Sequence, residues 1–123
     1  MIHSPADSTH PNFSQDMHDC IHHCQDCHDV CLETLQHCLE RGGKYSEAGT
    51  IRALMDCAQM CSLSSDFMVR GSKLHRDTCG LCAKACEICG AACAALSDDA
   101  MMQRCVDICA KCAKSCRQMS AMN

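Results

Sequence analysis

Cysteine residues recur along the chain in alternating steps of three and four positions. The spacing C-x3-C-x2-C-x3-C occurs three times, in residues 20–31, 82–93 and 105–116. Such steps place side chains on one face of an α-helix and add up to the seven-residue repeat of bundle helices. Residues such as Lys84 and Lys111 fall between the cysteines and are expected on the solvated face. The pattern therefore predicts helices that each bury a stripe of sulfur atoms.

Four helices are predicted, over about residues 14–41, 46–70, 73–96 and 97–119. The connections between them are short, which favours antiparallel neighbours. We therefore predict an all-α fold, an antiparallel up-down-up-down four-helix bundle with a Cys-lined core. Residues 1–12 hold both prolines and are predicted to be a loose N-terminal tail, and residues 13–123 a single four-helix bundle domain.

Capping residues set the predicted helix boundaries. Ser14 and Ser97 are the predicted N-caps, each followed by aspartate that suits the positive end of a helix. Gly42-Gly43 is predicted to end the first helix, and Gly71 the second. The predicted buried seams also include positions that are not cysteine: Phe13, Met17, Thr34 or Leu35, Thr50, Leu54, Ser64, Met68, His75, Met101 or Met102, and Met119.

Composition requires cysteine in the interior. Only 18 of the 123 residues are Leu, Ile, Val or Phe, and tryptophan is absent, so an ordinary hydrophobic core cannot be built. Buried cysteine packs as a small hydrophobe, but packing alone would not need 16 oxidisable side chains on one stripe. All of them are candidate metal ligands: Cys20, Cys24, Cys27, Cys31, Cys38, Cys57, Cys61, Cys79, Cys82, Cys86, Cys89, Cys93, Cys105, Cys109, Cys112 and Cys116.

The net charge and the N-terminal sequence indicate which partners and which cellular location to expect. The formal net charge is −4, with acids and bases interspersed, which argues against nucleic acid or a membrane as partner. No apolar run is long enough to predict a membrane span. The start, MIHSPADSTHPNF, lacks the basic and apolar regions of a secretory signal, so a cytoplasmic location is expected. Cytoplasmic thiols are kept reduced, which favours metal binding over a disulfide scaffold.

The number of thiolates favours a monovalent soft cation. Four zinc sites built from all the cysteines would bury a charge of about −8, which is very costly. Each Cu(I) ion neutralises one thiolate, so a core holding on the order of 16 ions is neutral. Each ion should also displace a proton, so uptake should weaken as the pH falls. This predicts Cu(I) storage or detoxification. The alternative is a cysteine-rich iron–sulfur or zinc-binding or redox protein with few discrete metal sites. No catalytic constellation is recognisable, so we predict no enzyme activity.

Four motifs together resemble the bacterial copper storage protein family, of the cytosolic type. They are CIHHCQDCHDVC, MDCAQMC, CGLCAKACEICGAAC and CVDICAKCAKSCRQM, and the resemblance covers roughly residues 17–119. It implies many Cu(I) ions bound by pairs of thiolates inside each bundle, and assembly into homotetramers. A copper chaperone or a small-molecule thiol is a candidate partner for loading and release. The chain departs from close relatives at Thr34-Leu35, where they carry another cysteine, and at DDAMMQRC, where some carry histidines.

Metal must reach such a core through one end of the bundle. One end collects His37, Cys38, Leu96, Met101 and Met102, and the other collects Phe13, Met17, Met68, His75 and Met119. Thioethers bind Cu(I), although methionine also fills irregular gaps at bundle ends. We predict uptake at the end with Met101, Met102 and His37, because Phe13 would close the other end and relatives carry histidine here. The off-seam histidines, His22, His23 and His28, are expected to be solvated or to flank the helix.

Overall fold

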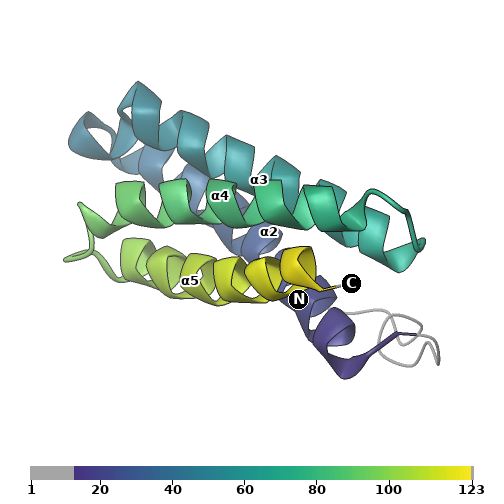
Figure 1. Cartoon of the computed structure of the whole chain (residues 1–123). Coiled ribbons are helices and arrows are strands. Elements are labelled where there is room, and N and C mark those ends of the chain that lie inside the picture. Colours follow the sequence, from purple (N-terminus) through teal and green to yellow (C-terminus); the bar gives the residue numbers. More distant parts are fainter. Residues whose placement is uncertain (1–12, 123) are drawn as a thin grey trace.

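The computed structural model describes residues 13–122 of the chain. The described part folds into the helices α2 (Gln15–Arg41), α3 (Ala48–Val69), α4 (His75–Ala94) and α5 (Ala100–Ala121), with a short 3-10 helix, η1 (Gly43–Ser46), between α2 and α3. Each α-helix packs against two others, in the cyclic order α2, α3, α4, α5 (Figure 1). The predicted all-α four-helix bundle is confirmed. The predicted tail, residues 1–12, lies outside the described residues.

The boundaries of α2 agree with the predicted caps. Ser14 is the N-cap, and its hydroxyl accepts a hydrogen bond from the Met17 backbone N–H at 3.1 Å. Gly42 ends the helix with a φ of 69°, a conformation that costs glycine little, and its N–H donates to the Cys38 carbonyl at 3.0 Å. Local sequence is sufficient to define this helix.

The second helix begins slightly later than predicted, because Ser46, its expected first residue, belongs to η1. Gly42 and Gly43 both have positive φ, and the turn they make leads into η1 and the buried ring of Tyr45. The Arg41 guanidinium lies 4.3 Å from the centre of this ring, and His37 meets it edge-on at 6.2 Å. Tertiary packing of the aromatic ring therefore delays α3 to Ala48.

The predicted N-cap of the last helix is wrong. Ser97 is exposed and lies in the turn after α4, whereas Asp99 is the N-cap of α5. Asp99 has extended backbone, and its carboxylate accepts from the N–H groups of Met101 and Met102 at 2.9 and 3.2 Å. Serine and aspartate are both good caps, so local preference does not separate them. The Asp99 carboxylate also contacts His37 and Arg41 of α2.

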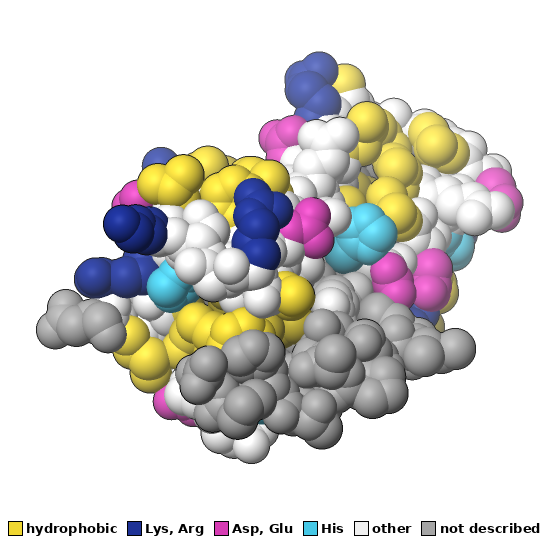
Figure 2. Space-filling model, turned by 90° about the vertical axis from the view of Figure 1, so that its right-hand side faces the viewer, with side chains coloured by type: hydrophobic (Ala, Val, Ile, Leu, Met, Phe, Trp, Pro, Cys, Tyr) yellow, Lys and Arg dark blue, Asp and Glu magenta, His cyan; other side chains and the backbone are white. Residues whose placement is uncertain are grey.

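Cysteine dominates the buried core, together with Ile21, Leu54, Met68 and Met102, which are all fully buried. Thr34, not Leu35, takes the buried seam position in α2. The end of the bundle seen in Figure 2, with the α3–α4 connection, carries apolar patches between basic and acidic side chains. Across residues 13–122, no helix is long and apolar enough to cross a membrane.

Candidate metal centre

All sixteen cysteines are free thiols and point into the bundle. Each is at most 1% exposed, so a metal ion among them would be shielded from water. The helices α2 and α4 contribute five cysteines each, α5 contributes four and α3 contributes two. The steps of three and four residues keep these side chains on the inner face of each helix.

Sulfur atoms of different helices lie in contact. Cys24 Sγ in α2 is 3.5 Å from Cys116 Sγ in α5, and Cys57 Sγ in α3 is 3.6 Å from Cys86 Sγ in α4. Sulfurs of the same helix are slightly farther apart, as for Cys27 and Cys31 at 3.9 Å. Small movements of these side chains would let one ion sit between two sulfurs, from one helix or from two.

Five groups of four sulfurs form a continuous array, which we call the sulfur column. In each group the four Sγ atoms lie within 4.8 Å of one another. Each group shares two sulfurs with the next, in the order Cys24, Cys82, Cys112 and Cys116; Cys61, Cys82, Cys86 and Cys112; Cys27, Cys57, Cys61 and Cys86; Cys27, Cys31, Cys57 and Cys109; Cys31, Cys89, Cys105 and Cys109. The four cysteines outside these five groups are Cys20, Cys38, Cys79 and Cys93.

Because neighbouring groups share sulfurs, divalent and monovalent ions would leave different net charges in the core. At most three of these five groups can be filled without sharing a sulfur. Three Zn²⁺ ions in twelve thiolates would leave a buried charge of about −6. The buried polar side chains of the described chain are Thr34, Ser64, Ser65 and Ser115, and none of them is cationic. Such a charge would be uncompensated and costly, whereas monovalent ions shared between thiolates cancel it.

Two cysteines that lie outside the five groups, Cys38 and Cys79, have raised pKa values and hold their protons at neutral pH. Burial, with Cys105 and Asp99 nearby, raises the pKa of Cys38 above its ordinary value. The neighbouring Cys116 thiol, together with burial, raises the pKa of Cys79 to about 12. A soft metal ion that binds either sulfur as a thiolate must therefore displace a proton.

Thiols inside the column influence one another's pKa. The nearby thiols of Cys105 and Cys109 raise the pKa of Cys31, and burial acts in the same direction. The nearby thiol of Cys109 lowers the pKa of Cys57, against the effect of burial. The column therefore contains thiols that deprotonate with different ease, although all of them are buried.

Two hydroxyl groups interrupt the sulfur lining. Thr34 Oγ1 donates to the Val30 carbonyl at 2.7 Å, so its hydroxyl is satisfied within its own helix. Ser64 Oγ lies 3.3 Å from Cys79 Sγ, in the position where a further cysteine of α3 would stand. Both side chains are fully buried. They are two buried seam positions at which a hydroxyl stands in place of a thiol.

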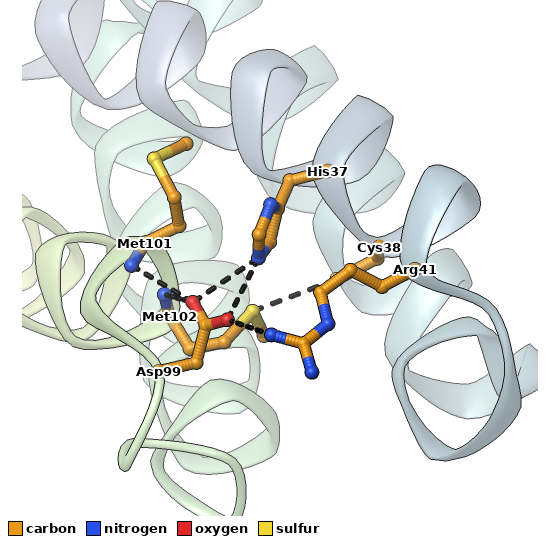
Figure 3. A network of polar contacts seen from close by, with 6 residues as sticks. All are labelled: His37, Cys38, Arg41, Asp99, Met101 and Met102. Carbon is orange, nitrogen blue, oxygen red and sulfur yellow. Dashed lines mark hydrogen bonds and ion pairs between the residues drawn. The ribbon is translucent and has the colours of Figure 1, made fainter.

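One end of the bundle, which we call the Met102 end, brings soft and polar groups together (Figure 3). Cys38 Sγ is 3.6 Å from Met102 Sδ, and Met102 is buried while Met101 is partly exposed. His37 and Arg41 contact the Asp99 carboxylate at 3.0 and 2.8 Å. Met102 therefore contacts Cys38 at the end where both were predicted, whereas the Met101 side chain points away from Asp99 and Cys38 in Figure 3. Sequence reasoning missed the cross-helix contacts of Asp99, which it treated only as a first-turn acid.

The opposite end, which we call the Met119 end, is filled by side chains. Met68 and Met119 are buried, and Phe13 lies edge-on against His18 with ring centres 5.7 Å apart. His75 does not face the core sulfurs as predicted. Its Nδ1 contacts the Ser72 carbonyl at 2.8 Å, because the ring turns toward the α3–α4 connection. Among the described residues, this end shows contacts between thiols, such as Cys20 with Cys116 at 3.7 Å, but no contact of a thiol with a thioether like that of Cys38 with Met102.

The off-seam histidines of α2 have polar partners at the bundle surface. His23 Nδ1 contacts Ser115 Oγ in α5, and His28 Nδ1 contacts Asp29 at 2.8 Å. Both histidines are only partly buried. They therefore lie outside the sulfur column and flank the bundle, partly buried rather than fully solvated.

Known proteins share this fold and cysteine pattern. The family model described as copper storage protein matches residues 13–121. The uncharacterized cysteine-rich protein YhjQ of Bacillus subtilis is 36% identical over 102 residues, which cover 83% of this chain and 94% of that protein.

Two solved structures are similar along most of the chain. The Cu(I)-bound copper storage protein BsCsp3 of Bacillus subtilis is 36% identical, with a TM-score of 0.81 over 87% of this chain and 100% of the other. The copper storage protein Ccsp of Streptomyces lividans, loaded with 10 copper equivalents, is 26% identical, with a TM-score of 0.78 over 96% and 92%. A copper storage protein from the same organism is described as cytosolic.

Proposed function

The chain belongs to the copper storage protein family, and we propose that all sixteen of its cysteines are Cu(I) ligands. The protein stores several Cu(I) ions through cysteine thiolates in the bundle core, and it is not an enzyme. Both statements agree with the predictions from sequence. The finer proposal concerns how many ions the core holds and which residues hold them.

The observation that carries this proposal is that neighbouring groups of the column share sulfurs, while no cationic side chain is buried in residues 13–122. When each sulfur bridges two ions and each ion takes two sulfurs, ions and thiolates balance at about one to one. The filled core is then neutral and holds roughly 16 ions. Discrete zinc sites are the second candidate, because three groups of the column can be filled without sharing.

We propose that copper enters and leaves at the Met102 end. In this role we call that end the metal port. The contact between Cys38 Sγ and Met102 Sδ supports this, because thiolate and thioether are both soft ligands. Met101 is partly exposed and can meet an arriving ion first. Met68 and Met119 fill the other end.

We also propose that the protein is cytoplasmic and forms a homotetramer. A cytoplasmic location is supported by the cytosolic relative of Streptomyces lividans. A homotetramer is implied by the resemblance, and apolar side chains on the outer faces of α3 and α4, such as Leu63, Leu81 and Ile88, are exposed at 41%, 55% and 57%. Light scattering of the purified protein would test it. Residues 13–123 are proposed to act as one domain, and a copper chaperone or a small-molecule thiol to exchange metal with it.

An anaerobic titration of the reduced apo-protein with Cu(I), against a coloured chelator, tests the storage proposal. A break near one ion per cysteine would support the neutral core. A break near three ions, or a chelator that wins throughout, would contradict it. A parallel titration with Zn²⁺ measures the second candidate directly, because discrete sites would fill at about three equivalents.

A further inference from the structure

Asp99 connects the first turn of α5 to the last turns of α2 (Figure 3). Its carboxylate accepts hydrogen bonds from two backbone N–H groups of α5 and meets His37 Nε2 and Arg41 Nη1 of α2. The side chain is only 8% exposed. An ionised carboxylate offers about four acceptor sites, so these four donors use its capacity.

The first consequence concerns the Met102 thioether. The backbone N–H groups of Met101 and Met102 both bind Asp99 Oδ1, which fixes the first turn of α5. From this turn, the Met102 side chain reaches into the core and places Sδ 3.6 Å from Cys38 Sγ. The cap therefore sets the position of one soft ligand against another.

The second consequence concerns the His37 ring. Because an ionised carboxylate can only accept, Nε2 of His37 must carry the hydrogen in its contacts with Oδ1 and Oδ2 of Asp99 at 3.1 and 3.0 Å. In the neutral form of the ring, the lone pair is then on Nδ1. Nδ1 lies on the side of the ring away from the carboxylate in Figure 3, and no described residue hydrogen bonds to it. Histidine that binds metal commonly donates its other N–H to a carboxylate in this way.

We propose that Asp99 is the positioning residue of the metal port. It holds His37 with Nδ1 ready to take a Cu(I) ion and holds Met102 ready to pass the ion to Cys38. Arg41 balances the carboxylate charge, so that Asp99 orients ligands without itself retaining the ion. This inference rests on the proposed function and on uptake at the Met102 end.

The test is the rate at which the reduced apo-protein takes Cu(I) from a coloured chelator complex in a stopped-flow experiment. Asp99→Asn keeps an oxygen that can cap α5 but loses the charge that binds His37 and Arg41. We expect uptake to slow by roughly tenfold, the usual scale for loss of a residue that orients a metal ligand, at unchanged final capacity. Asp98→Asn is the matched control, since Asp98 is the adjacent and exposed acid.

A double-mutant cycle separates positioning from mere stabilisation. If Asp99 acts through His37, Asp99→Asn should slow uptake much less in a His37→Ala background than in the natural protein. Asp99→Ser, which keeps only the cap, should behave like Asp99→Asn. Equal rates for the natural protein and Asp99→Asn would overturn the inference, as would full additivity with His37→Ala. A lower final capacity in both Asp99 variants would assign Asp99 a structural role and overturn it too.

The same experiment distinguishes this inference from the storage proposal. If the natural protein fails to approach one Cu(I) per cysteine, the storage proposal fails before any variant is compared. If it fills and the Asp99 variants fill at the same rate, only the role of Asp99 is lost.

Discussion

Replacing Cys61 by serine should remove only one or two Cu(I) ions from the filled core. Cys61 Sγ lies 3.6 Å from Cys82 Sγ and 3.9 Å from both Cys86 Sγ and Cys112 Sγ, and it belongs to two groups of the sulfur column. If this sulfur bridges two ions, its loss leaves each of them with one ligand. Capacity then falls by about one ion if the neighbours rearrange and by about two if they do not, or roughly 6–12% of the total.

Discrete tetrahedral sites predict that Cys61→Ser loses a different fraction of the bound ions. If three independent groups each held one Zn²⁺-like ion, loss of Cys61 would remove about one ion in three. Native mass spectrometry under anaerobic conditions counts bound ions one by one and resolves these outcomes. Ala83→Ser is the control, because it adds a hydroxyl at another fully buried position without removing a sulfur. An unchanged capacity for Cys61→Ser, or a loss of about a third of the bound ions, would refute the shared column.

Three other perturbations test the core and its chemistry. Ser64→Cys should raise capacity by about one ion, because Ser64 Oγ already lies 3.3 Å from Cys79 Sγ; an unchanged count in the same mass measurement would argue against simple extension of the column. Leu54→Ala should lower the free energy of unfolding of the apo-protein by about 2–5 kcal/mol, since Leu54 is fully buried and little other aliphatic volume supports the core; a loss below about 1 kcal/mol in urea denaturation would contradict this. Copper affinity should fall as the pH falls, by about tenfold per pH unit for each ion that displaces one proton. Affinity falls in this direction because the raised pKa of Cys38 keeps its thiol protonated at and below neutral pH, so that protons compete with Cu(I). Chelator competition at two pH values, corrected for protonation of the chelator, measures this trend. Thiols that were already ionised would show no such trend.

Local sequence was sufficient to predict the helices and the face that each one buries. The steps between Cys20, Cys24, Cys27 and Cys31 are the steps of a helical stripe, and these residues are all buried. Ser14 and Gly42 bound α2 as expected, because cap preference acts within a few residues of the chain. The scarcity of other apolar residues indicated that the stripes had to meet in one core.

Contacts between helices could not be predicted from the same pattern. The three equal cysteine motifs do not reveal that Cys24 meets Cys116 or that Cys57 meets Cys86, because those pairs depend on the stagger and rotation of antiparallel helices. The choice of Asp99 over Ser97 as a cap also depended on α2, whose His37 and Arg41 reach only the former.

The sequence by itself thus determined how many thiols line the core and why a soft monovalent ion suits them, since both follow from residue type, spacing and charge. Only the tertiary structure decided which sulfurs share an ion and which residues surround the port. The sulfurs of the column come from four helices, and the Asp99 network joins residues 58 and 62 positions apart in the chain. Separations of that kind are set by packing of the whole bundle, which short-range periodicity does not encode.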